Sequence, residues 1–261
     1  MIKLSACIEM LFPEIDEFSQ RIPAAAAAGL DGVEFWSYSN KDLSAVASAC
    51  RDTGLPVTAM TIEAPEGMLD YSLADGFADA TQQAITAAQT VDCKTLICTT
   101  NIATPIPTDI NRNRAHAGIV ACLKTAAPLA EEAGITLVLE PLNILVDHPG
   151  YFLTSSLEGF EIVEQVGSSA VKLLYDIYHQ QVTEGNLIAT ITSHIDLIGH
   201  FHAADVPGRH EPGTGEINCA NVLAAISEAG YKGFVGLEYA PTVATAESLQ
   251  AVLAMREEIN S

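Results

Sequence analysis

The stretch EEAGITLVLEP (131–141) contains the pattern that decides the fold: a helix end, a glycine, a short turn, and an apolar strand with a glutamate near its carboxyl end. The same pattern occurs in AAAGLDGVEF (26–35) and SEAGYKGFVGLEY (227–239). Glycine is favoured just after a helix because it adopts a left-handed conformation there without steric cost. The repetition predicts helices that are each followed closely by a strand, as in βα units.

The apolar pattern continues this order along the whole chain. Strands are expected at 4–8, 32–36, 57–62, 95–100, 136–141, 171–179, 199–205 and 234–239, with helical patterns between them, among others at 15–29, 112–134, 156–167 and 219–230. Eight strands alternating with eight helices, with no Pro/Ser-rich linker, predict an α/β fold: a single (β/α)8 TIM barrel domain over residues 1–261. A doubly wound dinucleotide-binding fold is disfavoured because no GxGxxG follows the first strand.

The charge balance restricts the possible partners. The chain has 33 acidic residues but only 12 lysines and arginines, for a net charge of −21. Phosphate backbones and anionic membranes are bound by clustered basic residues, so we expect no nucleic-acid or membrane partner. No apolar run reaches the roughly 18 residues of a membrane span. The start, MIKLSACIEMLF, is typical of a strand rather than a secretory signal, and the six cysteines show no CxxC spacing. We therefore expect a cytoplasmic protein with reduced thiols.

Ionisable residues occur where four consecutive predicted strands end. They are Glu140 on the fifth strand, Asp176 on the sixth, His202 on the seventh and Glu238 on the eighth. The active sites of TIM barrels lie at the carboxyl ends of the strands. Because side chains alternate along a strand, apolar neighbours such as Leu139 take the opposite face. The four polar groups are therefore expected to converge in the barrel mouth.

Three carboxylates and one imidazole in one place would repel one another without a cation. This oxygen-rich set with a single nitrogen suits Mn²⁺ or Mg²⁺, with Co²⁺ as an alternative, whereas zinc sites more often recruit further His or Cys. Glu34 also stands near a strand end. The first, third and fourth predicted strands have no ionisable group at their ends to accompany it. We therefore expect Glu34 to support the site from behind the ligands or to position the substrate.

Several motifs resemble the hydroxypyruvate isomerase family of the xylose isomerase-like barrels. The motifs are LEPLN (139–143), LLYDIYHQQ (173–181), ADVPGRHEPGTGEIN (204–218) and GFVGLEY (233–239), and the similarity runs essentially from end to end. The resemblance implies that Glu140 and Glu238 are the catalytic pair. By analogy with the related D-tagatose 3-epimerases, it also implies that Glu140, Asp176, His202 and Glu238 hold the metal.

The resemblance also assigns residues to the substrate. It places His179 and Arg209 near the substrate oxygens, and we expect Arg209 to pair with a carboxylate through a bidentate contact. The turn EPGTGE (211–216) would hold this loop over the mouth. One position departs from the family, since many hydroxypyruvate isomerases carry glutamine where this chain has His202. Ketose 3-epimerases have histidine there, which favours a metal-dependent site.

The expected reaction is the isomerisation of a small α-hydroxy carbonyl acid, hydroxypyruvate to 2-hydroxy-3-oxopropanoate, through an enediolate. A 2-oxo-tetronate isomerase, a ketose 3-epimerase and a catalytically silent sugar-binding barrel are the alternatives. A DNA-repair endonuclease of the same superfamily is disfavoured by the negative charge. We expect a small hydroxy-carbonyl molecule as the partner and a homo-oligomeric state.

Overall fold

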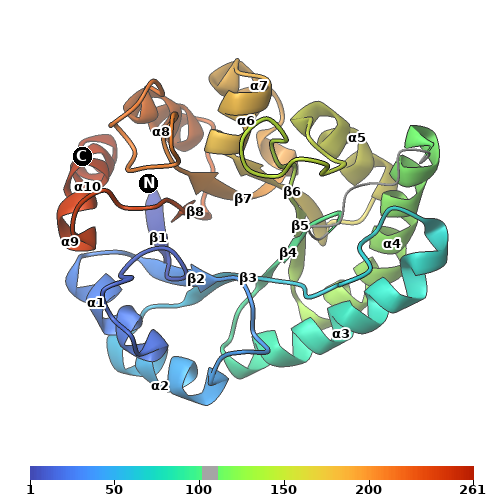
Figure 1. Ribbon diagram of the computed structural model, residues 1–261, viewed down its shortest axis with the longest axis horizontal. Helices are drawn as coiled ribbons and strands as arrows, with labels where there is room; N and C mark the ends of the chain where they lie inside the picture. The colour runs from blue at the N-terminus through green and yellow to red at the C-terminus, as the bar shows by residue number, and fades with distance from the viewer. Residues whose placement is uncertain (102–110) are drawn as a thin grey trace.

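Strands β1 to β8 of the computed structural model form a closed barrel in which every neighbouring pair is parallel and β1 pairs with both β2 and β8 (Figure 1). The structure describes residues 1–101 and 111–261. The strands are β1 (Lys3–Cys7), β2 (Gly32–Phe35), β3 (Val57–Thr61), β4 (Thr95–Cys98), β5 (Thr136–Leu139), β6 (Val171–Asp176), β7 (Ile198–Ala203) and β8 (Phe234–Leu237). The predicted TIM barrel is confirmed.

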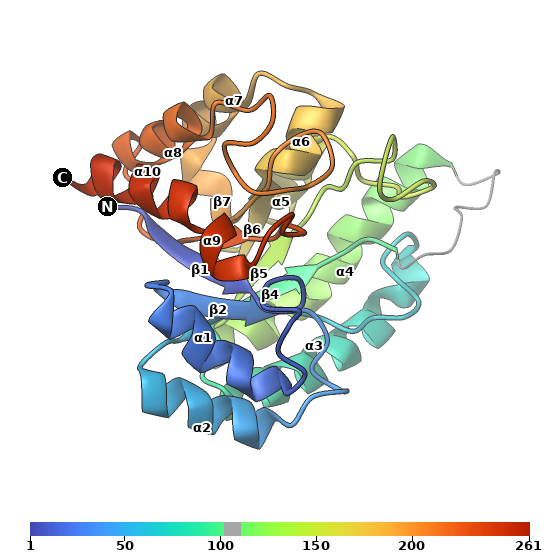
Figure 2. The same ribbon diagram turned by 60° about the vertical axis from the view of Figure 1, so that its left-hand side comes forward.

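Helices surround the barrel on its outside (Figures 1 and 2). They are α1 (Arg21–Ala27), α2 (Leu43–Thr53), α3 (Ala74–Thr90), α4 (Arg112–Ala133), α5 (Ser156–Val166), α6 (Ile177–Thr183), α7 (Leu187–Ser193), α8 (Cys219–Glu228), α9 (Thr245–Ser248) and α10 (Gln250–Asn260), with short 3-10 helices at Phe18–Gln20, Tyr71–Leu73 and Ile195–Leu197. The two chain ends lie side by side, and Asn260 both accepts from the Ile2 amide and donates to the Ile2 carbonyl (Figure 2). This contact joins the last helix to the residue that precedes the first strand.

One predicted strand is wrong in its second half. The segment 171–179 was expected to be extended throughout, but β6 ends at Asp176 and α6 begins at Ile177. The cause is local, because Asp176 Oδ1 accepts a hydrogen bond from the His179 backbone amide at 3.0 Å and so caps the helix. A second departure is that α6 and α7 both lie between β6 and β7, so the alternation is not strictly one helix per strand.

The glycine of the opening motif has the predicted role. Gly134 follows α4 with a φ of 64°, and its amide bonds back to the Ala130 and Glu131 carbonyls. This left-handed turn is readily adopted by glycine. It leads the chain within two residues into β5, which places Glu140 at the carboxyl end of that strand.

The barrel interior is divided between apolar and polar side chains. An apolar cluster separate from the main core comes from four neighbouring strands and consists of Ala59, Ile97, Val138 and Leu174. On the other side of the barrel, buried polar side chains of β1, β2, β3 and β7 meet, namely Ser5, Glu34, Thr58 and His200. Burying polar groups is costly unless they are hydrogen-bonded, so this half of the interior has a specific organisation.

Two further predictions concern cysteines and membranes. The six cysteines, all in the described part of the chain, are free thiols, five of them buried and Cys50 partly buried. In residues 1–101 and 111–261 no helix has the length and apolar character needed to cross a bilayer.

Candidate active site at the barrel mouth

The structure brings together the four residues expected to form the metal site. Glu140 directly follows β5, Asp176 ends β6, His202 lies in β7 and Glu238 directly follows β8. All four are buried, and one ligand atom from each lies within 4.8 Å of the others. His202 Nδ1 is central, at 3.2 Å from Glu140 Oε1, 3.3 Å from Glu238 Oε2 and 3.9 Å from Asp176 Oδ2.

The charges in this cluster perturb one another strongly. Burial by itself disfavours the imidazolium of His202, but the Glu238 and Glu34 carboxylates outweigh it and raise the His202 pKa well above its usual range. Burial likewise favours the neutral form of Glu238, but Arg209 and His202 hold the Glu238 pKa well below its usual range. For Asp176 burial dominates and raises the pKa. Groups with pKa values perturbed in opposite directions are characteristic of functional sites.

Arg209 reaches the same cluster from the loop after β7. Its Nη2 donates to Glu238 Oε2 and lies 3.8 Å from Asp176 Oδ2. Its Nε is buried and has no hydrogen-bond partner among the described residues. The arginine therefore neutralises the carboxylates of the mouth and retains a free donor, whereas the sequence had indicated only a contact with substrate.

His179 is also buried at the mouth, in the first turn of α6. Its Nδ1 lies 2.6 Å from the side-chain nitrogen of Asn143, which donates to it, so the ring proton is on Nε2. Burial first, and Arg209 second, lower the His179 pKa to about 3. The Nε2–H group lies 3.7 Å from Asp176 Oδ2 and has no hydrogen-bond partner among the described residues, and the ring lines the cavity. His179 thus presents a neutral hydrogen-bond donor.

The loop that carries Arg209 is organised by one carboxylate. Asp205 is fully buried and accepts hydrogen bonds from four backbone amides, those of Val206, Gly213, Gly215 and Ile217, at 2.8 to 3.0 Å. A Cβ at position 215 would lie 2.1 Å from the Val206 carbonyl oxygen, which explains the second glycine of the GTG turn. Glu211 links this loop to the loop after β8, because its carboxylate accepts a hydrogen bond from the Thr242 amide at 2.6 Å. The EPGTGE turn therefore holds the loop through its backbone.

Trp36 also contacts the site, although its sequence position alone did not predict this. Its indole nitrogen donates to Glu238 Oε1 at 2.6 Å, and the side chain is 41% exposed. Trp36 directly follows β2, so its place at a strand end was the available signal. With Arg209 on the other oxygen, Trp36 fixes the orientation of the Glu238 carboxylate.

A cavity of about 920 Å³ opens onto this cluster. Its lining includes the strand-end groups Glu140, His202 and Glu238. Three further carboxylates of the lining come from the segment after β3 and from α3; they are Glu63, Glu66 and Asp79. In the described part of the lining, Arg209 is the sole lysine or arginine. The volume lies within the range of small-molecule sites.

Comparisons with known proteins agree with this architecture. A model of the xylose isomerase-like TIM barrel family matches residues 22–257. Hydroxypyruvate isomerase from Escherichia coli is 34% identical over 96% of this chain and 98% of its own. The 2-oxo-tetronate isomerase from Cupriavidus necator is 38% identical over 55% of each chain. The crystal structure of AP endonuclease, family 2, from Brucella melitensis superposes with a TM-score of 0.91 at 28% identity, covering 97% of this chain and 99% of that one.

The fold and the family model define the class, a xylose isomerase-like barrel with ionisable groups gathered in its mouth. Within that class the chain belongs to the hydroxypyruvate isomerase family, and it is an isomerase of small molecules.

Proposed function

We propose that the protein interconverts hydroxypyruvate and 2-hydroxy-3-oxopropanoate, with Glu140 and Glu238 as the proton-transfer residues. The observation that supports this most is the placement of two strand-end glutamates in one cavity, each within 3.3 Å of His202 Nδ1, in a chain with hydroxypyruvate isomerase relatives. A general base must reach the proton that it removes, and both carboxylates line the cavity.

The residues of the cluster fit a divalent cation. Asp176 Oδ2 is buried without a hydrogen-bond partner among the described residues, and it lies 3.8 Å from Arg209 Nη2 and 3.9 Å from His202 Nδ1. Oxygen donors with a single imidazole suit Mn²⁺ or Mg²⁺, with Co²⁺ as an alternative. Glu140, Asp176, His202 and Glu238 would hold the ion. When bound, such an ion withdraws electrons from a carbonyl oxygen and so acidifies the neighbouring C–H bond.

The glutamates then carry the proton. One of them takes a proton from C3 of hydroxypyruvate, and the electron pair of the broken C–H bond forms the C2–C3 double bond of an enediolate. The proton is returned to C2, and the proton of the C3 hydroxyl passes to the C2 oxygen, so that C3 becomes the aldehyde and C2 carries the hydroxyl group. The other glutamate serves the oxygen atoms or the far side of the enediolate. Trp36 and Arg209 hold Glu238 in a fixed orientation for this transfer.

Arg209 and His179 bind the substrate in this proposal. Arg209 is the one strongly basic side chain in the described lining, and its Nε is free, so it suits the substrate carboxylate. His179 offers its Nε2–H to a substrate oxygen and stays neutral while doing so. The acidic remainder of the lining disfavours a nucleic-acid substrate.

The first experiment measures turnover of hydroxypyruvate, 2-oxo-tetronates and a set of ketohexoses by Mn²⁺-loaded protein. Hydroxypyruvate is expected to react fastest. If a 2-oxo-tetronate reacts fastest, the result supports a 2-oxo-tetronate isomerase instead. If a ketohexose reacts fastest, it supports a ketose 3-epimerase. Glu140→Gln and Glu238→Gln should each lose about 10²–10⁴ in kcat, the usual contribution of acid–base catalysis. Glu164→Gln, on the exposed face of α5, is the matched control. Wild-type turnover by both site variants would refute the proposal.

A further inference from the structure

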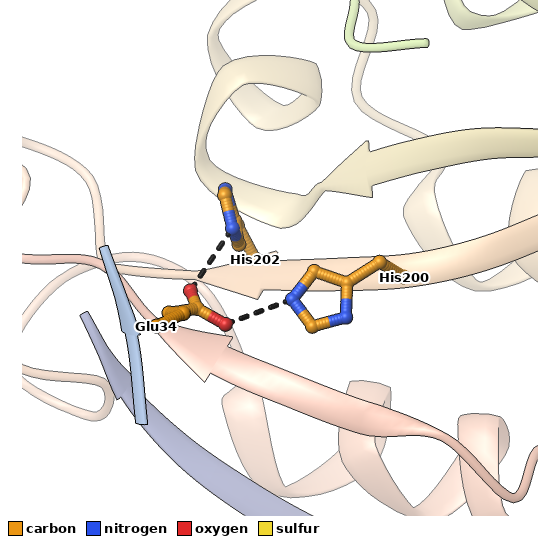
Figure 3. Close-up of side chains that lie close together, drawn as sticks. All are labelled: Glu34, His200 and His202. Atoms are coloured by element: carbon orange, nitrogen blue, oxygen red, sulfur yellow. Dashed lines mark hydrogen bonds and ion pairs between the residues drawn. The ribbon is translucent and has the colours of Figure 1, made fainter. Parts of the chain in front are cut away.

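Glu34 lies between two histidines inside the barrel. Figure 3 shows its carboxylate reaching His200 with one oxygen and His202 with the other. The distances are 2.9 Å from Oε2 to His200 Nε2 and 3.0 Å from Oε1 to His202 Nε2. All three side chains are at most 3% exposed. Glu34 and the histidines come from β2 and β7, strands that lie on either side of β1 and β8 in the barrel.

The two oxygens of Glu34 have different surroundings. Oε2 accepts from Ser5 Oγ at 2.9 Å and from Thr58 Oγ1 at 3.1 Å, in addition to His200. Oε1 lies 3.0 Å from His202 Nε2 as an ion pair, and among the described residues neither of these two atoms has a hydrogen-bond partner. Three donors thus fix one oxygen, which leaves the other aimed at His202.

A glycine makes room for this arrangement. Gly236 on β8 stands opposite His202 in the strand register, and a Cβ there would lie 2.1 Å from Glu34 Oε1. Any larger residue would push the carboxylate away from the imidazole. The strand backbone is therefore adapted to the contact between Glu34 and His202.

His202 uses its two nitrogens in opposite directions. Nε2 faces Glu34, and Nδ1 faces Glu140, Glu238 and Asp176. A histidine that binds a cation through one nitrogen needs its proton on the other, and a carboxylate bonded to that second N–H fixes both the tautomer and the ring orientation. Because Oε2 is already bonded to three donors, Glu34 suits this supporting role better than direct coordination of a second ion.

We propose that Glu34, held in place by His200, Ser5 and Thr58, is a positioning residue that directs His202 Nδ1 at the cation of the mouth. This inference rests on the metal site of the proposed function. Glu34 does not touch substrate; it acts through His202. Substitutions of such supporting partners typically cost 10–100-fold in metal affinity.

Glu34→Gln is the sharpest variant. If the amide oxygen takes the place of Oε2 and keeps its three donors, the amide NH₂ faces His202 Nε2. That nitrogen must then accept, which moves the ring proton to Nδ1 and blocks coordination. We expect the dissociation constant for Mn²⁺ alone, measured from the paramagnetic resonance signal of free Mn²⁺, to rise about 10–100-fold. The control Glu184→Gln, a glutamate bonded to Ser156 outside the barrel, should bind Mn²⁺ as wild type does.

The outcomes separate the inference from the proposed function. Wild-type Mn²⁺ affinity in folded Glu34→Gln overturns the positioning role but leaves the metal site intact. Failure of the wild-type protein to bind Mn²⁺ overturns the metal site and the positioning role together.

A measurement on wild-type protein decides the matter if the variant does not fold. With Co²⁺ bound, the Nε2–H of His202 should give a paramagnetically shifted proton resonance that exchanges slowly with water, because the Glu34 carboxylate lies 3.0 Å from Nε2 in the buried interior. Absence of this resonance, or its rapid exchange, would contradict the proposal.

Discussion

Asp205→Asn should loosen the loop that carries Arg209. In the structure Oδ1 accepts from the amides of Val206 and Ile217, and Oδ2 accepts from those of Gly213 and Gly215. Asparagine keeps one oxygen and replaces the other with an NH₂ group, which cannot accept. Two backbone amides then face a donor in a site with no exposure to water.

The size of the effect follows from the number of bonds lost. A hydrogen bond to a charged group contributes about 1.5–3 kcal/mol, so two lost bonds cost about 3–6 kcal/mol. Taking about 3 kcal/mol, the two amides that lose their acceptor, either Gly213 and Gly215 or Val206 and Ile217, should lose about 100-fold in protection against hydrogen exchange. If the loop opens with the whole chain, Tm falls by about 6–12 °C. If it opens alone, Tm changes less and only the loop amides lose protection.

The assay is hydrogen exchange followed by NMR, with thermal unfolding beside it. Asp52→Asn, at an exposed site on α2, is the matched control and should change neither quantity. Wild-type protection of the loop amides in Asp205→Asn, together with an unchanged Tm, would refute the assignment of Asp205 as the organiser of the loop.

Three other predictions concern the mouth. Arg209→Ala should raise KM for a carboxylate substrate about 10- to 150-fold and change KM for a neutral ketose far less, as initial-rate kinetics would show; equal effects would mean that the arginine is structural. Asp176→Ala should weaken Mn²⁺ binding and activity together, which titration calorimetry and turnover can check, and full activity in a chelator would contradict it. His179 should stay neutral from pH 7 to about pH 4, as seen by the ¹⁵N shifts of its ring, because burial and then Arg209 lower its pKa to about 3. Since the unfolded chain takes up that proton near pH 6.5, the contribution of His179 to the free energy of unfolding falls as the pH drops from about 6.5 toward 3; a midpoint near 6.5 in the folded protein would contradict this.

Much of the fold was predictable because it depends on local patterns. The helix–glycine–strand motif precedes β2, β5 and β8, and Gly134 has the left-handed backbone conformation that the motif requires. The end of β6 was not predictable from apolar periodicity, which runs on through Ile177 and Tyr178. The strand stops there because the Asp176 side chain caps the next helix, a contact that periodicity does not reveal.

The part of the candidate site that comes from consecutive strands was predictable. Glu140, Asp176, His202 and Glu238 follow from strand ends alone, and the structure gathers them. The contacts of Glu34 with His200 and His202 were not predicted, because they depend on barrel closure, which brings side chains of β2 and β7 together across the interior. The Trp36 contact with Glu238 depends on the same closure. The homo-oligomeric state and the cytoplasmic location remain predictions.

Deuterium tracing tests the central claim most directly. Metal-loaded protein is incubated with hydroxypyruvate in heavy water, beside an enzyme-free sample, and the products are followed by NMR at early times. A proton carried by a glutamate exchanges with solvent before it returns, so wild type should place deuterium at C2 of 2-hydroxy-3-oxopropanoate. Glu140→Gln and Glu238→Gln should each form this product about 10²–10⁴ times more slowly. Product that carries no deuterium at C2 beyond the enzyme-free level would contradict proton transfer through an exchangeable carboxyl group, as would undiminished incorporation in both variants.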